Sequence, residues 1–427
     1  MRPLATKLGK MSGGALRKIS GNAGALFAIQ LANALLPLLL APFLARTLGK
    51  DGYGLFALGI AFIQVATIFT DYGFGLSAVY QIARTRGNTS RIQRIAGAVY
   101  ACKIILCVLA TAGVFAYPLL REEYAAHRDY FWVLSLSVIG ITLQPVWLFQ
   151  GLERMGSITL YVLASRLSFV ALTLLLARDA GDLELVAWFN GLSHLLAAGI
   201  GLAFVRRAGV WPRWTSWRYA WKIFHSSTEY FWSRLAVASY GAGAILFLGT
   251  FSTPAQVALY SVAEQFYRGA IAVYSPVTQA LYPHMARHRD VTLFKRLFAA
   301  AVALAVVGIA LGVILGPWLI GFVFGPEYAQ SYGVFFVFML ALGAAIPSIL
   351  LGYPFLGAMG NASAANRSVV FAGLVQVLAL AVLYVGHWFS ALAVVGAVLA
   401  AEVSALLWRI HFARPYFKTS ISVAGTK

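Results

Sequence analysis

The stretch from residue 297 to residue 323 reads LFAAAVALAVVGIALGVILGPWLIGFV and contains no charged side chain. About 20 consecutive apolar residues are enough for an α-helix to cross the hydrocarbon core of a bilayer. The whole chain has the same character, because 60% of its 427 residues are hydrophobic and only 11% are charged. This composition excludes a cytosolic enzyme, a secreted domain and a nucleic-acid-binding protein.

Apolar runs of this kind recur along the chain, separated by polar, glycine or proline residues. Twelve of them are long enough to be membrane-spanning helices. The predicted helices are 22–45, 53–83, 95–117, 130–151, 156–177, 183–205, 223–249, 257–284, 293–323, 330–357, 362–386 and 389–411. The predicted fold class is therefore an all-α polytopic membrane protein with 12 transmembrane helices.

The distribution of basic residues predicts the orientation, because cytoplasmic loops are enriched in lysine and arginine. With the N-terminus inside, the basic clusters at 2–18, 84–94, 206–222 and 287–296 all fall on the cytoplasmic side, and the outer loops are net acidic. Both termini are then cytoplasmic. Topology and attraction to anionic lipid headgroups account for most of the net charge of +19.

The chain also resembles itself at an offset of 204 residues. This offset places Met155-Gly156 on Met359-Gly360 and the segment GLFA at 54–57 on ALYS at 258–261. A parallel duplication predicts two six-helix lobes with a central cleft. The predicted parts are a basic cytoplasmic N-terminal segment at 1–21, an N-lobe with helices one to six at 22–205, a basic cytoplasmic linker at 206–222, a C-lobe with helices seven to twelve at 223–411 and a cytoplasmic C-terminal tail at 412–427.

Charged residues inside the predicted helices are the candidates for function. Each ionised group at the bilayer centre costs about 2.5–3.5 kcal/mol on insertion scales, so it is expected to line a wet cavity or to be paired. Arg166, Arg234 and Arg268 lie near the middle of helices five, seven and eight. We expect them, with Lys103 of helix three, to be cavity cations that bind an anionic substrate, since a guanidinium grips phosphate oxygens bidentately. The alternative is that they only neutralise intramembrane acids.

Asp71 and Glu264 are the acidic candidates, for ion coupling or for contact with sugar hydroxyls. Asp71 lies in the segment FTDYGFG at 69–75, where glycines allow the backbone to open, and it is equally suited to pair with Lys103. Glu264 and Arg268 are four residues apart and can pair on one helical face. Such a pair could also act as a switch, since an acid released from its arginine can take a proton.

The sequence lacks the usual enzyme signatures. It contains no phosphate-binding glycine-rich loop, no H-E-x-x-H motif and no Cys/His cluster, and Cys102 and Cys107 lie in one apolar segment as expected of packing residues. We therefore expect a protein that is not an enzyme and that holds no metal or organic cofactor. Because a nucleotide-binding domain is also missing, transport would be driven by an ion gradient of H⁺ or Na⁺ or would run downhill.

Several segments resemble a known family. The stretches LPLLLAPFLARTLG at 36–49, GYGLF at 52–56 and DYGF at 71–74 resemble the N-terminal signature of polysaccharide-biosynthesis flippases, the Wzx-type O-antigen translocases. The segments LYSVAEQF at 259–266 and ALYP at 280–283 are similar to the opening of their second half. The resemblance spans essentially the whole chain.

The resemblance implies a member of the multidrug/oligosaccharidyl-lipid/polysaccharide (MOP) exporter superfamily, with two six-helix lobes around a central V-shaped, partly cationic cavity. It implies a flippase that moves undecaprenyl-pyrophosphate-linked oligosaccharide repeat units across the bacterial inner membrane for O-antigen or exopolysaccharide biosynthesis. Alternating access coupled to an ion gradient is the implied mechanism. The implied partners are this lipid-linked oligosaccharide, membrane lipids, a polysaccharide polymerase and a chain-length regulator.

Two other functions stay open at this point. A MATE-like multidrug/cation antiporter of the same superfamily predicts an acid-dominated cavity, whereas basic residues outnumber acidic ones in the predicted helices. A polytopic O-antigen polymerase or ligase acts on the same lipid-linked substrate. Those enzymes usually carry a long periplasmic loop, and the longest predicted outer loop, at 118–129, is short.

Overall fold

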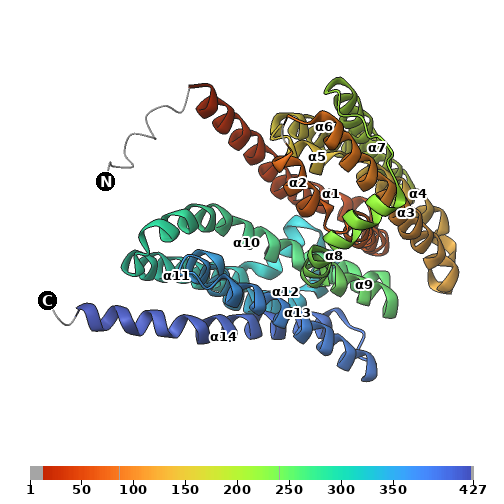
Figure 1. Ribbon diagram of the computed structural model, residues 1–427. Helices are drawn as coiled ribbons and strands as arrows, with labels where there is room; N and C mark the ends of the chain where they lie inside the picture. The colour runs from red at the N-terminus through yellow and green to blue at the C-terminus, as the bar shows by residue number, and fades with distance from the viewer. Residues whose placement is uncertain (1–12, 86, 240, 425–427) are drawn as a thin grey trace, which may run out of the picture. The chain divides into compact units, whose positions relative to one another are not determined.

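The structure is a computed structural model that describes residues 13–85, 87–239 and 241–424 (Figure 1). These residues form helices joined by short turns, and no strand occurs in the described ranges. The α-helices are α1 Gly13–Asp71, α2 Phe74–Arg84, α3 Thr89–Leu120, α4 Arg128–Leu143, α5 Val146–Gly151, α6 Met155–Leu176, α7 Leu183–Arg207, α8 Trp217–Ser239, α9 Ala242–Phe251, α10 Pro254–His288, α11 Val291–Val323, α12 Tyr332–Leu350, α13 Ala362–Val385 and α14 Ala391–Ala424. Short 3₁₀-helices cover η2 Glu122–His127, η3 Ala180–Asp182 and η4 Pro326–Ser331, and a π-helix covers η5 Leu351–Gly357.

Each predicted transmembrane helix coincides with one of these helices or with consecutive helical pieces, so the all-α polytopic class is confirmed. Nine helical stretches in the described part of the chain are long and apolar enough to cross a membrane. The helix α1 contains the first predicted span and the larger part of the second, which continues in α2, and a kink at Gly49, where φ is 68°, separates the two spans. The helix α14 continues to Ala424, well into the segment predicted as a tail.

Side-chain caps determine where several helices begin. The side chains of Asn88, Thr253, Asp290 and Asn361 each accept a hydrogen bond from a backbone N–H in the first turn of the following helix, α3, α10, α11 and α13 respectively. These caps satisfy N–H groups that have no partner inside the helix. Helix boundaries therefore follow from local sequence at these four turns.

The chain divides into two compact units. Unit 1 combines the residues up to 37 with 66–177 and 184–231, and unit 2 combines 38–65, 178–183 and 232–427. Both units are discontinuous in sequence, whereas the predicted lobes at 22–205 and 223–411 are continuous. The predicted lobe boundaries stay a prediction.

Both units bury large aromatic side chains, and unit 2 also contains a cluster of small residues. A cluster in unit 1 contains large side chains such as Phe74, Trp147 and Tyr161. In unit 2, Ala372 of α13 lies in a cluster with Ala401 and Ala405 of α14. Small residues allow helix backbones to approach closely, which is how membrane helices associate when lipid tails are as apolar as their side chains.

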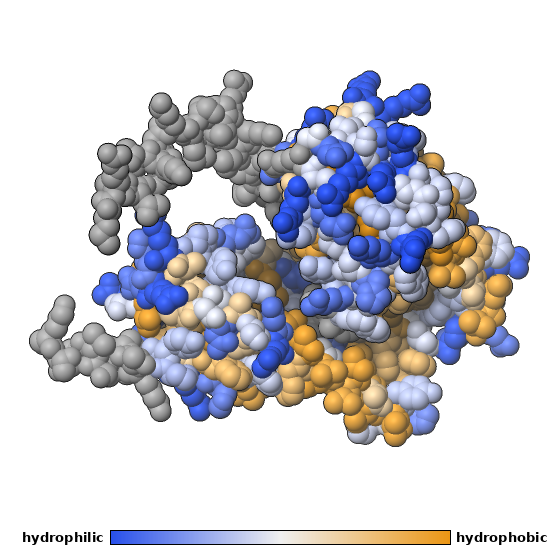
Figure 2. All heavy atoms as spheres, in the orientation of Figure 1, coloured by the Kyte–Doolittle hydropathy of each residue, from blue (hydrophilic) through white to orange (hydrophobic). Residues whose placement is uncertain are grey.

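Hydrophobic side chains also cover much of the outer surface. Leu120, Ile314 and Val385 are among the most exposed of them. Figure 2 shows broad hydrophobic areas on the face in view, with hydrophilic residues gathered elsewhere. Apolar areas this extensive are expected on a protein whose solvent is the hydrocarbon of a bilayer.

Candidate functional site

The membrane helix around Asp71 is broken between α1 and α2. Tyr72 and Gly73 both have left-handed backbone conformations, with φ of 41° and 80°. A Cβ atom at Gly73 would lie 2.7 Å from the Cβ of Tyr230 and 2.8 Å from the carbonyl oxygen of Ser227, so only glycine allows α8 to approach this closely. The break places the carboxylate of Asp71 at the C-terminal end of α1.

The helix α8 holds this break in position. The ring of Tyr72 stacks between Phe224 and Phe231, with centroid distances of 4.0 and 4.5 Å. The hydroxyls of Ser77 and Ser227 are 2.5 Å apart and form a buried hydrogen bond. The broken segment is therefore a packed feature of unit 1, because aromatic and polar contacts fix both of its sides.

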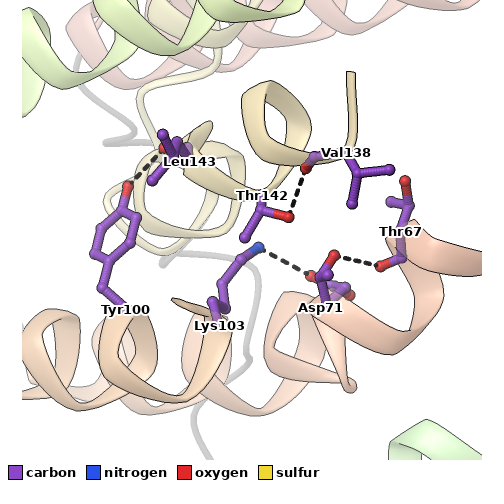
Figure 3. Close-up of polar contacts among 8 residues, drawn as sticks. Thr67, Asp71, Tyr100, Lys103, Val138, Thr142 and Leu143 are labelled. Atoms are coloured by element: carbon purple, nitrogen blue, oxygen red, sulfur yellow. Dashed lines mark hydrogen bonds and ion pairs between the residues drawn. The ribbon is translucent and has the colours of Figure 1, made fainter. Parts of the chain in front are cut away.

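Asp71 pairs with Lys103 of α3 inside unit 1 (Figure 3). The Lys103 ammonium nitrogen lies 3.9 Å from the Asp71 carboxylate, and the two side chains are 5% and 17% exposed. The structure thus contains the Asp71–Lys103 pair that the sequence analysis considered. This distance is longer than that of a direct hydrogen bond between charged groups, so the two side chains attract each other electrostatically without such a bond.

A chain of polar groups continues from the break between α4 and α5. The hydroxyl of Tyr100 donates to the carbonyl of Leu143, which loses its helical partner at this break. The adjacent amide nitrogen of Gln144 lies 3.3 Å from Nδ1 of His194 on α7. The hydroxyl of Ser165 on α6 lies 3.5 Å from the same ring nitrogen. The end of α4 and the helices α6 and α7 thus meet in one polar cluster around His194, and α3 bonds to the neighbouring residue Leu143.

Arg166 follows Ser165 on α6 and is half-buried. Among the described side chains, no carboxylate lies within ion-pair distance of Arg166. An intramembrane guanidinium of this kind keeps several N–H donors for an anion, because it is always charged and has five of them.

Glu264 and Arg268 of α10 form an ion pair in unit 2, with 2.8 Å between the Arg268 Nη2 and the Glu264 Oε1 atoms. The glutamate side chain is 10% exposed and the arginine side chain is 46% exposed. A Cβ atom at Gly241, between α8 and α9, would lie 3.1 Å from the Arg268 guanidinium. The guanidinium therefore contacts its glutamate and lies close to Gly241 at the start of α9.

Glu402 of α14 is an intramembrane acid outside the six predicted candidates. The hydroxyl of Tyr267 on α10 donates to its carboxylate over 2.9 Å. The ring of Tyr267 also packs against Phe338 of α12, with centroids 5.1 Å apart. The only available sequence signal was an acid near the middle of an apolar helix, because its partner lies 135 residues earlier.

The remaining predicted cation, Arg234, lies on α8 with an exposed side chain and belongs to unit 2. The six candidates thus divide equally between the units. Lys103, Asp71 and Arg166 are in unit 1, and Arg234, Arg268 and Glu264 are in unit 2. The structure brings four of them together as two ion pairs, and Arg166 and Arg234 belong to neither pair. The roles of all six in binding or coupling stay predictions.

Arg409, near the end of the last predicted helix, has a structural role. Arg409 lies within α14, and its guanidinium donates to the Ser348 carbonyl over 2.7 Å and to the Ser368 hydroxyl over 2.7 Å. The π-helix η5 begins three residues after Ser348 and disturbs the regular hydrogen bonding of α12. Arg409 satisfies a carbonyl next to that irregularity.

Comparisons with known proteins agree with this architecture. The model of a family described as "Polysaccharide biosynthesis protein" matches residues 19–289. The chain belongs to this family. A relative in Escherichia coli (strain K12), named "Putative O-antigen transporter", is 30% identical over 313 residues, covering 71% of this chain and 75% of the relative. A protein of the same name in Shigella dysenteriae is 25% identical over 379 residues, covering 85% and 93%.

Solved structures of other proteins have a fold similar to that of this chain. The inward closed conformation of the lipid II flippase MurJ matches with a TM-score of 0.70 at 11% identity, covering 92% of this chain and 87% of that one. An inward-facing MATE transporter of the MOP superfamily matches with a TM-score of 0.61 at 14% identity, covering 91% and 95%. The MOP-type fold expected from the resemblance is therefore confirmed.

Proposed function

We propose that this family member is a flippase that carries undecaprenyl-pyrophosphate-linked oligosaccharide repeat units across the bacterial inner membrane. The relatives named as O-antigen transporters support this assignment. The structural observation that carries it is Arg166, a half-buried intramembrane cation with no carboxylate within ion-pair distance in the described residues. Such a cation suits an anionic cargo.

The chemistry of this cargo matches the polar interior of unit 1. A pyrophosphate with a hydrated glycan cannot enter hydrocarbon without replacement of its hydrogen bonds to water. The guanidinium of Arg166 supplies charged donors to phosphate oxygens, and neighbouring groups such as Gln144 and Ser165 offer hydrogen bonds to sugar hydroxyls. The polyprenyl tail stays in the surrounding lipid.

The two ion pairs are the proposed sites of coupling to H⁺ or Na⁺. Asp71 and Glu264 each have a basic partner, Lys103 and Arg268. A cargo phosphate that binds the basic partner releases its acid, which can then take a proton or a sodium ion. Alternating access between the two membrane faces would follow from such a competition.

The proposed setting is the inner membrane with both termini in the cytoplasm. A polysaccharide polymerase and a chain-length regulator are the proposed downstream partners, because a translocated repeat unit must next be polymerised. A MATE-like antiporter is a weaker candidate, since two of the described intramembrane acids, Asp71 and Glu264, already contact basic groups.

Arg166→Ala tests the proposal in a strain that lacks its own flippase. We expect surface polysaccharide to fall about tenfold or more while membrane abundance stays unchanged, since an arginine–phosphate contact contributes about 1.5–3 kcal/mol. Arg166→Lys should retain partial display, and Arg128→Ala, an exposed arginine of the η2–α4 loop region, serves as the matched control. Normal display by Arg166→Ala would refute this role.

A second assay measures transport directly. Proteoliposomes that contain the purified protein should move a fluorescent lipid-linked oligosaccharide between leaflets, and empty liposomes should not. Formation of longer glycan chains by the purified protein alone would instead identify a polymerase and overturn the flippase assignment.

A further inference from the structure

The segment that joins α7 to α8 has an unusual composition. Residues 206–222 read RRAGVWPRWTSWRYAWK, with no acidic residue. All of its basic side chains are exposed, as are its four tryptophans. These exposed side chains are Arg206, Arg207, Trp211, Arg213, Trp214, Trp217, Arg218, Trp221 and Lys222. Neither the core of unit 1 nor the proposed cargo site uses them.

The segment is held firmly on α3. The backbone N–H of Arg213 donates to the Gln93 carbonyl over 3.0 Å, and the side chain of Gln93 donates back to the Gly209 carbonyl over 2.9 Å. A Cβ atom at Gly97 would collide with the carbonyl of Arg213, so the backbones touch there. The exposed side chains are thus presented on a fixed scaffold.

The first turns of α8 have one buried face and one exposed face. Ala220 and Ile223 are buried, whereas Trp217 and Trp221 are 60% and 66% exposed. Arg218 and Lys222 follow each tryptophan by one residue and are also exposed. Residues four apart lie on one side of a helix, so two tryptophans and two cations form adjacent rows.

The neighbouring turn adds further positive charge. The guanidinium of Arg94 lies over the ring of Tyr219, 5.4 Å from its centroid, and Arg91 is exposed one turn earlier. The sequence has no acidic residue between Asp71 and Glu122. This face of unit 1 therefore combines several cations with amphipathic indole rings, and the sequence segments 72–121 and 206–222 that form it contain no acidic residue.

We propose that residues 206–222, with Arg91 and Arg94, form a binding surface for the headgroups of anionic phospholipids. Indole rings prefer the level of the headgroups, where their N–H groups reach water and their rings reach the acyl chains. Exposed arginines beside them bind the phosphates, and each basic residue near an anionic membrane strengthens binding about fivefold. The partner is fixed by charge complementarity, because a zwitterionic lipid offers no net charge to this surface.

Native mass spectrometry of the full chain in a neutral detergent tests this surface. Delipidated protein is titrated with phosphatidylglycerol or with phosphatidylcholine of identical acyl chains. We expect tighter retention of phosphatidylglycerol, with a loss of about fivefold for each charge removed in Arg213→Gln/Arg218→Gln/Lys222→Gln. The matched control, Arg121→Gln/Arg128→Gln/Arg178→Gln, removes three cations from other loops and should keep the preference.

Brominated lipids give an independent readout that needs no charge variant. Brominated phosphatidylglycerol should quench the tryptophan fluorescence of the wild-type protein more than brominated phosphatidylcholine does. Trp217→Phe/Trp221→Phe should reduce this difference, and the remaining Trp211 and Trp214 of the same surface should keep part of it. Equal retention of the two lipids, or an equal loss in the control variant, would overturn the proposal. Selective binding of undecaprenyl phosphate without a preference for phosphatidylglycerol would also overturn it, in favour of a cargo site.

Discussion

The two intramembrane ion pairs have the same charges but opposite environments. Asp71 and Lys103 come from different helices of unit 1, lie 3.9 Å apart and are both largely shielded from solvent. Glu264 and Arg268 come from one helix of unit 2, lie 2.8 Å apart, and leave the arginine side chain 46% exposed. Besides its proposed part in coupling, the first pair also holds two helices together, whereas the second leaves its arginine accessible to an anionic ligand.

The largest effect should follow from loss of the shielded cation. Lys103→Met leaves the Asp71 carboxylate without the ammonium, and breaking a buried pair costs about 3–5 kcal/mol of unfolding free energy. Thermal unfolding in detergent measures this loss. The double variant Asp71→Asn/Lys103→Met should recover most of it, because no unpaired charge is left. A fully stable Lys103→Met protein would contradict the structural role of the pair.

The next largest effect concerns the helix break beside Asp71. Gly73→Ala forces an L-residue into a left-handed conformation and drives its Cβ into the backbone of α8. The strain alone is about 1–3 kcal/mol, and overpacking adds to it. We expect lower unfolding free energy and lower membrane abundance. The same substitution at Gly113, where a Cβ has open space, is the control and should change neither quantity measurably.

Arg268→Ala should affect transport more than stability. Its guanidinium is partly exposed, so we expect surface polysaccharide to fall about tenfold, equivalent to about 1.4 kcal/mol, at unchanged abundance. The double variant Glu264→Gln/Arg268→Ala tests whether the glutamate left without its arginine causes the defect. If the arginine binds cargo, the double variant should transport as poorly as Arg268→Ala does. A parallel fall in protein abundance would make Arg268 a structural residue like Lys103.

The smallest effect is expected at Gly241. A Cβ there lies 3.1 Å from the flexible end of the Arg268 side chain, which can move away at little cost. Gly241→Ala should therefore leave thermal stability within about 0.5 kcal/mol of wild type. Transport should change by less than Arg268→Ala changes it. If Gly241→Ala lost as much transport as Arg268→Ala does, the position of the Arg268 guanidinium would be essential in addition to its charge.

Sequence patterns predicted the membrane helices well, because each apolar run must satisfy its own backbone hydrogen bonds inside lipid. The Glu264–Arg268 pair was predictable for a similar reason, since both residues lie on one face of one helix. Polar contacts at the helix breaks were harder to predict from the sequence. Gln144 was missed although Pro145 follows it directly, and only the structure shows its amide beside His194.

The sequence by itself determined the class of protein, the placement of its helices and the local pair in α10, because hydrophobicity and helical spacing act over a few consecutive residues. Only the tertiary structure decided three contacts. Asp71 forms an ion pair with Lys103, Tyr267 donates a hydrogen bond to Glu402, and Arg409 donates one to the Ser348 carbonyl in α12. These contacts join residues far apart in the chain. Apolar helices have many ways to pack, and polar partners inside the membrane are selected by the packing that brings them within reach.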